Sequence, residues 1–253
     1  METVIHDGAR VHPEARLGVG VEVMPGAIVT RWAELGDRVV VHPGAVIGGD
    51  PQYLGFDRST PSWVRVGADS VLREGVTLNR SMYADGATVL GDRCFFMANS
   101  HAGHDARVAS DVVLANGALL GGHVEVGAFV FIGGNAGVHQ FCRIGPVVMI
   151  GGVSPITCDV PPYCMATDRN QISGLNLVGL KRRGWSRDVI REIKEAYRVV
   201  IKPSGNMRTA AAELLNLAVS AEAKEFLEFF AGGKRGFARP RASTRADGSE
   251  SSV

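Results

Sequence analysis

A six-residue repeat of apolar anchors runs through most of the first 160 residues of the chain. Every anchor is apolar, although hydrophobic residues make up only 45% of the whole sequence. Glycine follows many of the anchors, and an interior glycine costs a helix about 1 kcal/mol. The repeat therefore predicts short strands joined by tight turns. The anchors are Ile5, Val11, Leu17, Val23, Val29, Leu35, Val41, Ile47, Val66, Leu72, Leu78, Leu90, Phe96, Ala102, Val108, Leu114, Leu120, Val126, Ile132, Val138, Ile144, Ile150 and Ile156.

Hexapeptide repeats are typical of β-helices, in which three hexads close one triangular coil of 18 residues. Residues 18 positions apart then stack on neighbouring coils, which lie about 4.8 Å apart. The sixfold pattern resembles the left-handed parallel β-helix family, and we take the hand of the coil from that resemblance. We predict a β-solenoid of this kind over residues 1–160.

Two stretches interrupt the repeat, at about residues 49–62 and 82–87, and we expect them to form loops ejected from the solenoid. Such loops often line functional sites. After Pro161-Pro162 the period ends and helical patterns begin, with Ser186 as an N-cap and apolar residues spaced three or four apart. Residues 161–231 are predicted to form a helical domain. Residues 232–253 lack periodicity, are rich in Gly, Ser and Arg, and are predicted to be a disordered tail.

Charge and composition exclude several classes of function. The chain has 27 Lys+Arg and 26 Asp+Glu residues, so it lacks the excess positive charge of a dedicated nucleic-acid binder. The four cysteines show no CxxC spacing, which favours reduced thiols in a cytoplasmic protein. We also expect no signal peptide and no integral membrane segment, because no apolar stretch approaches about 18 residues.

Four of the seven histidines, His101, His104, His123 and His139, fall within three successive predicted coils. With an 18-residue coil, His104, Gly122 and Gln140 form one stacked column. Asp105, His123 and Phe141 form the adjacent column. A cluster of imidazoles around one column predicts a functional site.

Two chemistries compete for this cluster. A zinc hydratase like the γ-type carbonic anhydrases needs three imidazoles about 2.0 Å from the metal, two of them from one coil and about five residues apart. His101 and His104 are three residues apart, which disfavours a metal site. The alternative is direct acyl transfer, in which a neutral imidazole removes a proton from a substrate hydroxyl that attacks a thioester. A backbone N–H at Gly122 could then stabilise the oxyanion. We predict this second chemistry, with no metal and no cofactor.

Several motifs resemble the UDP-N-acetylglucosamine 3-O-acyltransferase family of lipid A biosynthesis. The resemblance covers roughly residues 11–230. The matching segments are Asn99-Ser100-His101-Ala102-Gly103-His104-Asp105, Gly121-Gly122-His123-Val124, Val138-His139-Gln140-Phe141-Cys142, Asp159-Val160-Pro161-Pro162-Tyr163 and Gly179-Leu180-Lys181-Arg182-Arg183-Gly184.

This resemblance implies that His104 is the general base and Gly122 the oxyanion donor. Substrate contacts implied in the same way are Gln52, His101, Asp105, His123, His139, Gln140, Gly152, Asn176, Arg182 and Arg183. Of these, Asn176 and Arg183 would reach the nucleotide of a neighbouring subunit, and Arg182 would help to bind the acidic acyl carrier protein. A bulky residue at Gly152 would shorten the accepted acyl chain. We place the three cations at 181–183 near a helix N-terminus, where cations are unfavourable, and therefore expect them to bind an anionic ligand.

The implied reaction moves a (3-hydroxy)acyl chain from acyl carrier protein to a UDP-amino sugar, the first step of lipid A biosynthesis, in a homotrimer with sites between subunits. The acceptor is UDP-N-acetylglucosamine or a 3-amino analogue, because Tyr53 and Gly55 replace an Asp and a Lys of the family pattern. Two alternatives stay open. One is an acetyl-CoA-dependent sugar acetyltransferase, and the other is a catalytically silent homologue that binds carrier protein.

Overall fold

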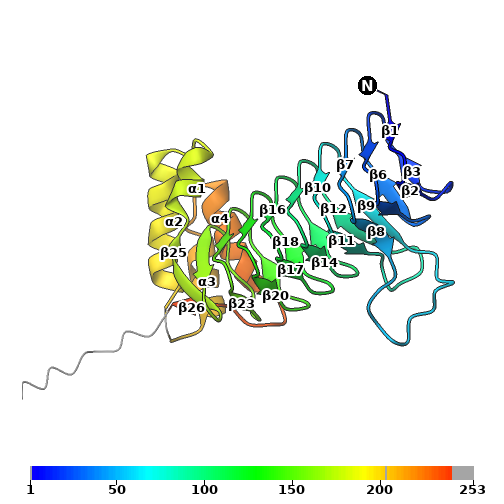
Figure 1. The fold of residues 1–253 in the computed structure, drawn as a ribbon. Coiled ribbons are helices and arrows are strands. Elements are labelled where there is room, and N and C mark those ends of the chain that lie inside the picture. Colours follow the sequence, from blue (N-terminus) through cyan, green and yellow to red (C-terminus); the bar gives the residue numbers. More distant parts are fainter. Residues whose placement is uncertain (1, 203, 241–253) are drawn as a thin grey trace, which may run out of the picture.

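In the computed structural model, which describes residues 2–202 and 204–240, successive short strands belong in turn to three parallel sheets (Figure 1). We call these sheets face A, face B and face C. Face A contains β1 (Val4–Ile5), β4 (Glu22–Val23), β7 (Val40–Val41), β10 (Val71–Leu72), β13 (Phe95–Phe96), β16 (Val113–Leu114), β19 (Phe131–Ile132) and β22 (Met149–Ile150). Face B contains β2 (Arg10–Val11), β5 (Ile28–Val29), β8 (Val46–Gly49), β11 (Thr77–Asn79), β14 (His101–Ala102), β17 (Leu119–Leu120), β20 (Gly137–Val138) and β23 (Pro155–Ile156). Face C contains β3 (Arg16–Leu17), β6 (Ala33–Leu35), β9 (Trp63–Val66), β12 (Ala87–Leu90), β15 (Arg107–Val108), β18 (Glu125–Val126) and β21 (Arg143–Ile144).

The predicted 18-residue register is present throughout the regular coils. Val4 pairs with Glu22, for example, and His101 pairs with Leu119. The apolar anchors fill the interior, and every anchor from Val23 to Ile156 is buried. The anchors of the first described coil are less covered, because no earlier coil packs on their outer side among the described residues.

The corner after each face B strand in the histidine region contains a residue with left-handed backbone. The φ angles are 61° at Asp105, 59° at His123 and 66° at Phe141. This conformation is uncommon for residues other than glycine, and its recurrence gives each coil the same turn. The three side chains therefore stack in a column, and the His123 and Phe141 rings lie parallel with their centroids 4.6 Å apart.

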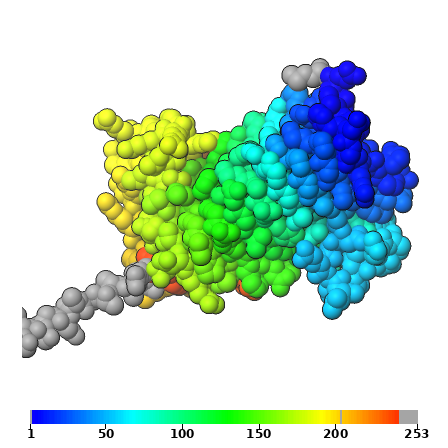
Figure 2. All heavy atoms as spheres, viewed as in Figure 1, coloured from blue at the N-terminus to red at the C-terminus, as the bar shows by residue number. Residues whose placement is uncertain are grey.

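The two interruptions of the repeat form the expected loops. Across the first, the pairing interval lengthens to 31 residues, as in the Arg38–Asp69 contact, and across the second it lengthens to 24. The loop at residues 49–62 protrudes from the N-terminal half of the surface (Figure 2). Arg80 fixes its base: this side chain is fully buried, contacts Asp50 Oδ1 at 2.9–3.0 Å and donates to the Arg58 carbonyl at 2.8 Å.

Beyond β23 the chain forms an antiparallel hairpin and four short α-helices. The hairpin is β24 (Cys164–Thr167) and β25 (Gln171–Leu175), which extend face A. The helices are α1 (Leu177–Arg182), α2 (Arg187–Val200), α3 (Met207–Leu215) and α4 (Ala221–Glu228), followed by the 3-10 helix η1 (Phe229–Ala231). Ser186 caps α2, as predicted. No helix among the described residues is long and apolar enough to cross a membrane.

Two expectations for this C-terminal part were wrong. Lys181 and Arg182 lie in the last turn of α1, where cations are favourable, so their charge is not evidence of an unfavourable helix start. Residues 232–240, assigned above to a disordered tail, run back along the solenoid and end in β26 (Arg239–Pro240), which pairs with β25. Residues 241–253 lie outside the described residues. One buried apolar cluster includes both solenoid and helices, so a domain boundary near residue 160 stays a prediction.

Candidate active site

A groove of about 460 Å³ lies along face B beside the histidine corner. His101, Leu119, Gly137 and Pro155, each at the same position of successive coils, form its floor. The other lining residues are Gln52, Asn79, Gly103, His104, Leu120, Gly121, Gly122, Val138, His139, Ile156 and Thr157. The structure thus brings Gln52, His101, His104, Gly122 and His139 together, as the sequence predicted.

His104 and Asp105 form a hydrogen-bonded pair at the edge of this groove. His104 Nδ1 lies 3.0 Å from Asp105 Oδ2. An ionised carboxylate can only accept a hydrogen bond, so Nδ1 carries the proton and Nε2 keeps its lone pair. The pair therefore holds His104 in the tautomer that a general base requires.

Asp105 is itself fixed by the short loop at 82–87 and its neighbours. Ser81 Oγ donates to Oδ1 at 2.5 Å, and the Met82 N–H donates to Oδ2 at 3.2 Å. Burial by itself would raise the pKa of Asp105, but the hydrogen bonds from His104, Ser81 and Met82 outweigh it and lower this pKa. Asp105 thus orients the base and does not line the groove, although it was predicted as a substrate contact.

Gly122 contributes a backbone donor next to the His104 ring. Among the described residues, no acceptor takes the Gly122 N–H. A Cβ built on Gly122 would lie 2.7 Å from His104 Nε2, and a Cβ on Gly103 would lie 2.9 Å from the Gly122 nitrogen. Glycine at both positions keeps this N–H uncovered beside the imidazole.

His101 and His123 differ in their placement relative to the groove. His101 lines the groove, and its Nδ1 lies 2.8 Å from Thr77 Oγ1. His123 does not line the groove; its ring packs edge-on against His104 at 5.1 Å, and its Nε2 is 3.8 Å from Asp105 Oδ2. Burial lowers the pKa of both His101 and His123, which favours their neutral forms.

The remaining predicted substrate contacts lie outside the His104 groove of the same chain. Gln140 is exposed next to His139, and Gly152 is exposed at the corner that precedes β23, outside the groove. Asn176, Arg182 and Arg183 line a separate groove of about 520 Å³ on face A. There Asn176 caps α1, and the Arg183 guanidinium lies 3.3 Å from the centroid of the Phe129 ring.

The sequence analysis missed several residues of the site, among them Ser81, Gly103 and Gly137. Ser81 meets Asp105 across an interval of 24 residues, which an 18-residue stacking rule does not bring together. Adding the six residues of the second interruption to the coil length would have placed Ser81 beside Asp105.

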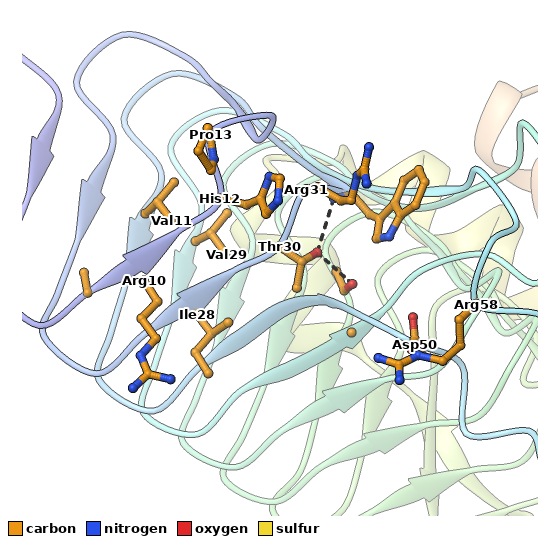
Figure 3. Close-up of a pocket in the computed structure, with 14 residues that line it drawn as sticks. Arg10, Val11, His12, Pro13, Ile28, Val29, Thr30, Arg31, Asp50 and Arg58 are labelled. Carbon is orange, nitrogen blue, oxygen red and sulfur yellow. Dashed lines mark hydrogen bonds and ion pairs between the residues drawn. The ribbon is translucent and has the colours of Figure 1, made fainter.

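A larger groove of about 720 Å³ lies on the N-terminal part of face B, at the base of the protruding loop (Figure 3). Arg10, Arg31 and Arg58 surround apolar residues there, and it contains none of the predicted site residues. Of these two grooves we assign the active site to the smaller one, because it contains Gly122 and His104, whose ring is paired with Asp105.

His104, Asp105 and His123 could also offer three ligand atoms within 4.8 Å of one another to a metal ion. However, the atoms of His104 and Asp105 that face each other are already hydrogen-bonded. This pairing favours proton transfer as the chemistry of the cluster.

Comparisons with known proteins agree with this geometry. Residues 159–238 match a family described as "Udp N-acetylglucosamine O-acyltransferase; Domain 2". An acyl-(acyl-carrier-protein)–UDP-N-acetylglucosamine O-acyltransferase of Rhizobium johnstonii is 39% identical over 87% of this chain and 82% of its own length. The enzyme of that name from Campylobacter concisus is 35% identical over 90% of this chain and 87% of its own length. The UDP-N-acetylglucosamine acyltransferase from Campylobacter jejuni superposes with a TM-score of 0.83 and 32% identity, over 94% of this chain and all of that one.

The solenoid is accordingly a left-handed parallel β-helix, and with its histidine groove it defines a hexapeptide-repeat acyltransferase. Within that class, the chain belongs to the family of acyl-(acyl-carrier-protein)–UDP-N-acetylglucosamine O-acyltransferases.

Proposed function

We propose that this protein transfers an acyl chain, a 3-hydroxyacyl chain in particular, from acyl carrier protein to the 3-position of a UDP-amino sugar, the first step of lipid A biosynthesis. The observation that carries the proposal is the placement of His104. Its Nδ1 is hydrogen-bonded to Asp105, and its ring lies in the groove against Gly122, whose N–H has no acceptor among the described residues.

The reaction follows from these positions. His104 Nε2 takes the proton of the sugar hydroxyl as that oxygen attacks the thioester carbon, and a C–O bond forms. The charge that develops on the carbonyl oxygen is stabilised by the Gly122 N–H, a contribution of about 3 kcal/mol. Asp105 stabilises the imidazolium. When the C–S bond breaks, His104 returns its proton to the carrier-protein thiolate.

A direct test compares turnover of His104→Ala with that of the wild type by mass spectrometry. A general base contributes about 10²-fold or more, so we expect at least that loss with an unchanged fold. The matched control is His6→Ala, at a histidine on the first coil whose side chain is paired with Glu22, far from the groove in the sequence. Activity of His104→Ala within threefold of wild type would contradict the assignment.

The protruding loop at residues 49–62 is the part of the site where this chain departs from the family pattern for the acceptor. Gln52 lines the groove, whereas the Tyr53 ring lies over Gly55, where a Cβ would meet it at 3.0 Å. A carboxylate and an ammonium of the family pattern are absent from these two positions. We nevertheless propose UDP-N-acetylglucosamine as the acceptor, because the relatives are named for it. The assay offers the 3-amino analogue as a competing acceptor and acetyl-CoA as a competing acyl donor.

We also propose a homotrimer, because the candidate site is divided between two faces of one chain. The outward positions of face A are mostly apolar, as at Val71, Phe131 and Met149, and face B carries Ile28, Val46 and Leu119. Face C instead presents Arg16, Glu34, Arg65, Arg107, Glu125 and Arg143. Faces A and B thus suit burial against other copies, and a threefold axis that pairs face A with face B closes the assembly.

In that arrangement the face A groove with Asn176, Arg182 and Arg183 meets the His104 groove of the next subunit. The acidic acyl carrier protein would then approach the exposed Arg182. Light scattering should give three times the chain mass of 26.9 kDa. Mixed refolding of equal amounts of His104→Ala and Arg183→Ala chains should restore about a quarter of the wild-type activity, since about three quarters of the trimers are mixed and each of these has one intact site of three. A monomer, or no recovery on mixing, would refute the shared site.

We propose a cytoplasmic location for the enzyme. All four cysteines are free, and Cys94, Cys142 and Cys164 are buried. Burial raises the pKa of Cys94 to about 11, which suits unreactive, reduced thiols.

A further inference from the structure

The segment of residues 232–240, which we call the strap, is held against the end of the solenoid by backbone contacts (Figure 1). The Asp159 N–H donates to the Gly236 carbonyl, and the Ala238 N–H donates to the Asp159 carbonyl, both at 2.9 Å. The Arg208 guanidinium donates to the carbonyls of Phe230 and Gly233 at 2.8 Å. None of these contacts uses the side chain of Arg235. The strap should therefore stay in place when that side chain is replaced.

The Arg235 guanidinium meets the imidazole of His139, which lines the active-site groove. Arg235 Nη2 is 2.7 Å from His139 Nδ1. The Nε atom of Arg235 is buried and has no hydrogen-bond partner among the described residues. A guanidinium is always charged and offers only donors, so Nδ1 must present its lone pair.

One contact competes for the same atom. The Gln140 carbonyl lies 3.2 Å from His139 Nδ1 and could only accept a hydrogen bond from it. The contact with Arg235 is shorter and charge-assisted, and such bonds are about twice as strong as neutral ones. The Arg235 contact therefore decides the tautomer.

We infer that Arg235 is a positioning residue that keeps the His139 proton on Nε2, so that His139 donates a hydrogen bond to an oxygen of the bound sugar nucleotide. His139 is then the opposite tautomer to His104. The His104 Nε2 is free to accept a proton, whereas the His139 Nε2 carries a proton and donates a hydrogen bond. The inference rests on the proposed function, because it requires the sugar nucleotide to occupy this groove.

The first test needs no substrate. In ¹⁵N-histidine-labelled protein at pH 8, wild-type His139, identified by its absence from a His139→Asn spectrum, should show the proton on Nε2 alone. In Arg235→Ala, a population with the proton on Nδ1, bonded to the Gln140 carbonyl, should appear. Arg235→Lys, which keeps a cationic donor, should restore the wild-type pattern. The matched control is Lys234→Ala, an exposed neighbour in the same strap.

The second test is a kinetic cycle. Loss of one hydrogen bond should raise KM for the sugar nucleotide about tenfold in Arg235→Ala and in His139→Ala, with KM for acyl carrier protein unchanged. Because Arg235 acts through His139, the double variant should be no worse than His139→Ala alone. An unchanged tautomer, or effects that multiply to about 100-fold, would overturn the inference. Failure of the wild type to turn over would instead count against the proposed function and leave the tautomer result standing.

Discussion

Gly122→Ala tests the centre of the proposed site with a single methyl group. Its Cβ would lie 2.6 Å from His104 Cε1 and 2.7 Å from Nε2, whereas ordinary contacts begin near 3.4 Å. The ring must therefore move by about 1 Å, and its bond to Asp105 restricts that movement. A displacement of about 1 Å costs on the order of 10²-fold in rate, or about 2.7 kcal/mol of barrier.

Folding should tolerate this substitution. Gly122 has no positive φ, so alanine adopts its backbone without strain. Replacing glycine by alanine at such a position stabilises a protein by about 0.4–1 kcal/mol, because it lowers the conformational entropy of the unfolded chain. This gain offsets part of the cost of the clash. We therefore expect a loss of kcat with a melting temperature within a few degrees of wild type.

Gly137→Ala is the matched control, because a Cβ at this groove position meets nothing within 4 Å. The assay is kcat and KM for both substrates, with acyl transfer followed by mass spectrometry and melting by circular dichroism. Gly137→Ala should stay within about threefold of wild type. If Gly122→Ala kept wild-type kcat, or if both variants lost activity equally, the placement of the base and the oxyanion donor would be refuted.

Asp105→Asn should lower kcat by about 10²-fold or more with little change in KM, because an amide can hold His104 in the wrong tautomer; an unchanged kcat would contradict the orienting role. Arg80→Met should destabilise the base of the 49–62 loop by about 2 kcal/mol and expose that loop to limited proteolysis; a loop that stays resistant would exclude Arg80 as its anchor. Gly152→Met should shift preference toward shorter acyl donors, and an unchanged ratio of kcat/KM for long and medium donors would place the acyl groove elsewhere. Burial lowers the pKa of His101, so below about pH 6.5 the unfolded chain binds a proton that the native state does not, and stability should fall as pH falls; His101→Gln should flatten this dependence in urea unfolding.

The solenoid could be predicted from the sequence because its core residues recur every six positions along the chain. Anchors such as Leu72 and Ile132 are buried where the sixfold pattern puts them, and the column of Asp105, His123 and Phe141 follows from the coil length alone. The contact between His104 and Gly122 was predictable for the same reason, since residues one coil apart become neighbours without further information.

Contacts outside the period could not be predicted in this way. Arg80 is buried by its fit between Trp32, Phe56 and the loop carbonyls, and a charged residue in a sequence carries no sign of such a cage. The strap is held by backbone hydrogen bonds to Asp159, which any sequence of suitable flexibility can make. Asn176 and Arg183 lie on face A because the chain turns back after β25. Tertiary packing determines the direction of this turn, and the repeat does not encode it.

The two ejected loops leave and re-enter the solenoid without shifting the coils on either side. His101 still pairs with Thr77 and Leu119, although the interval to Thr77 includes the second loop. Coil register thus sets the distance from His104 to Gly122, while the 49–62 loop brings Gln52 to the groove. A loop grafted between Gly49 and Trp63 should leave this register in place if it keeps partners for the buried Arg80, which makes the segment a module for redesigning the acceptor.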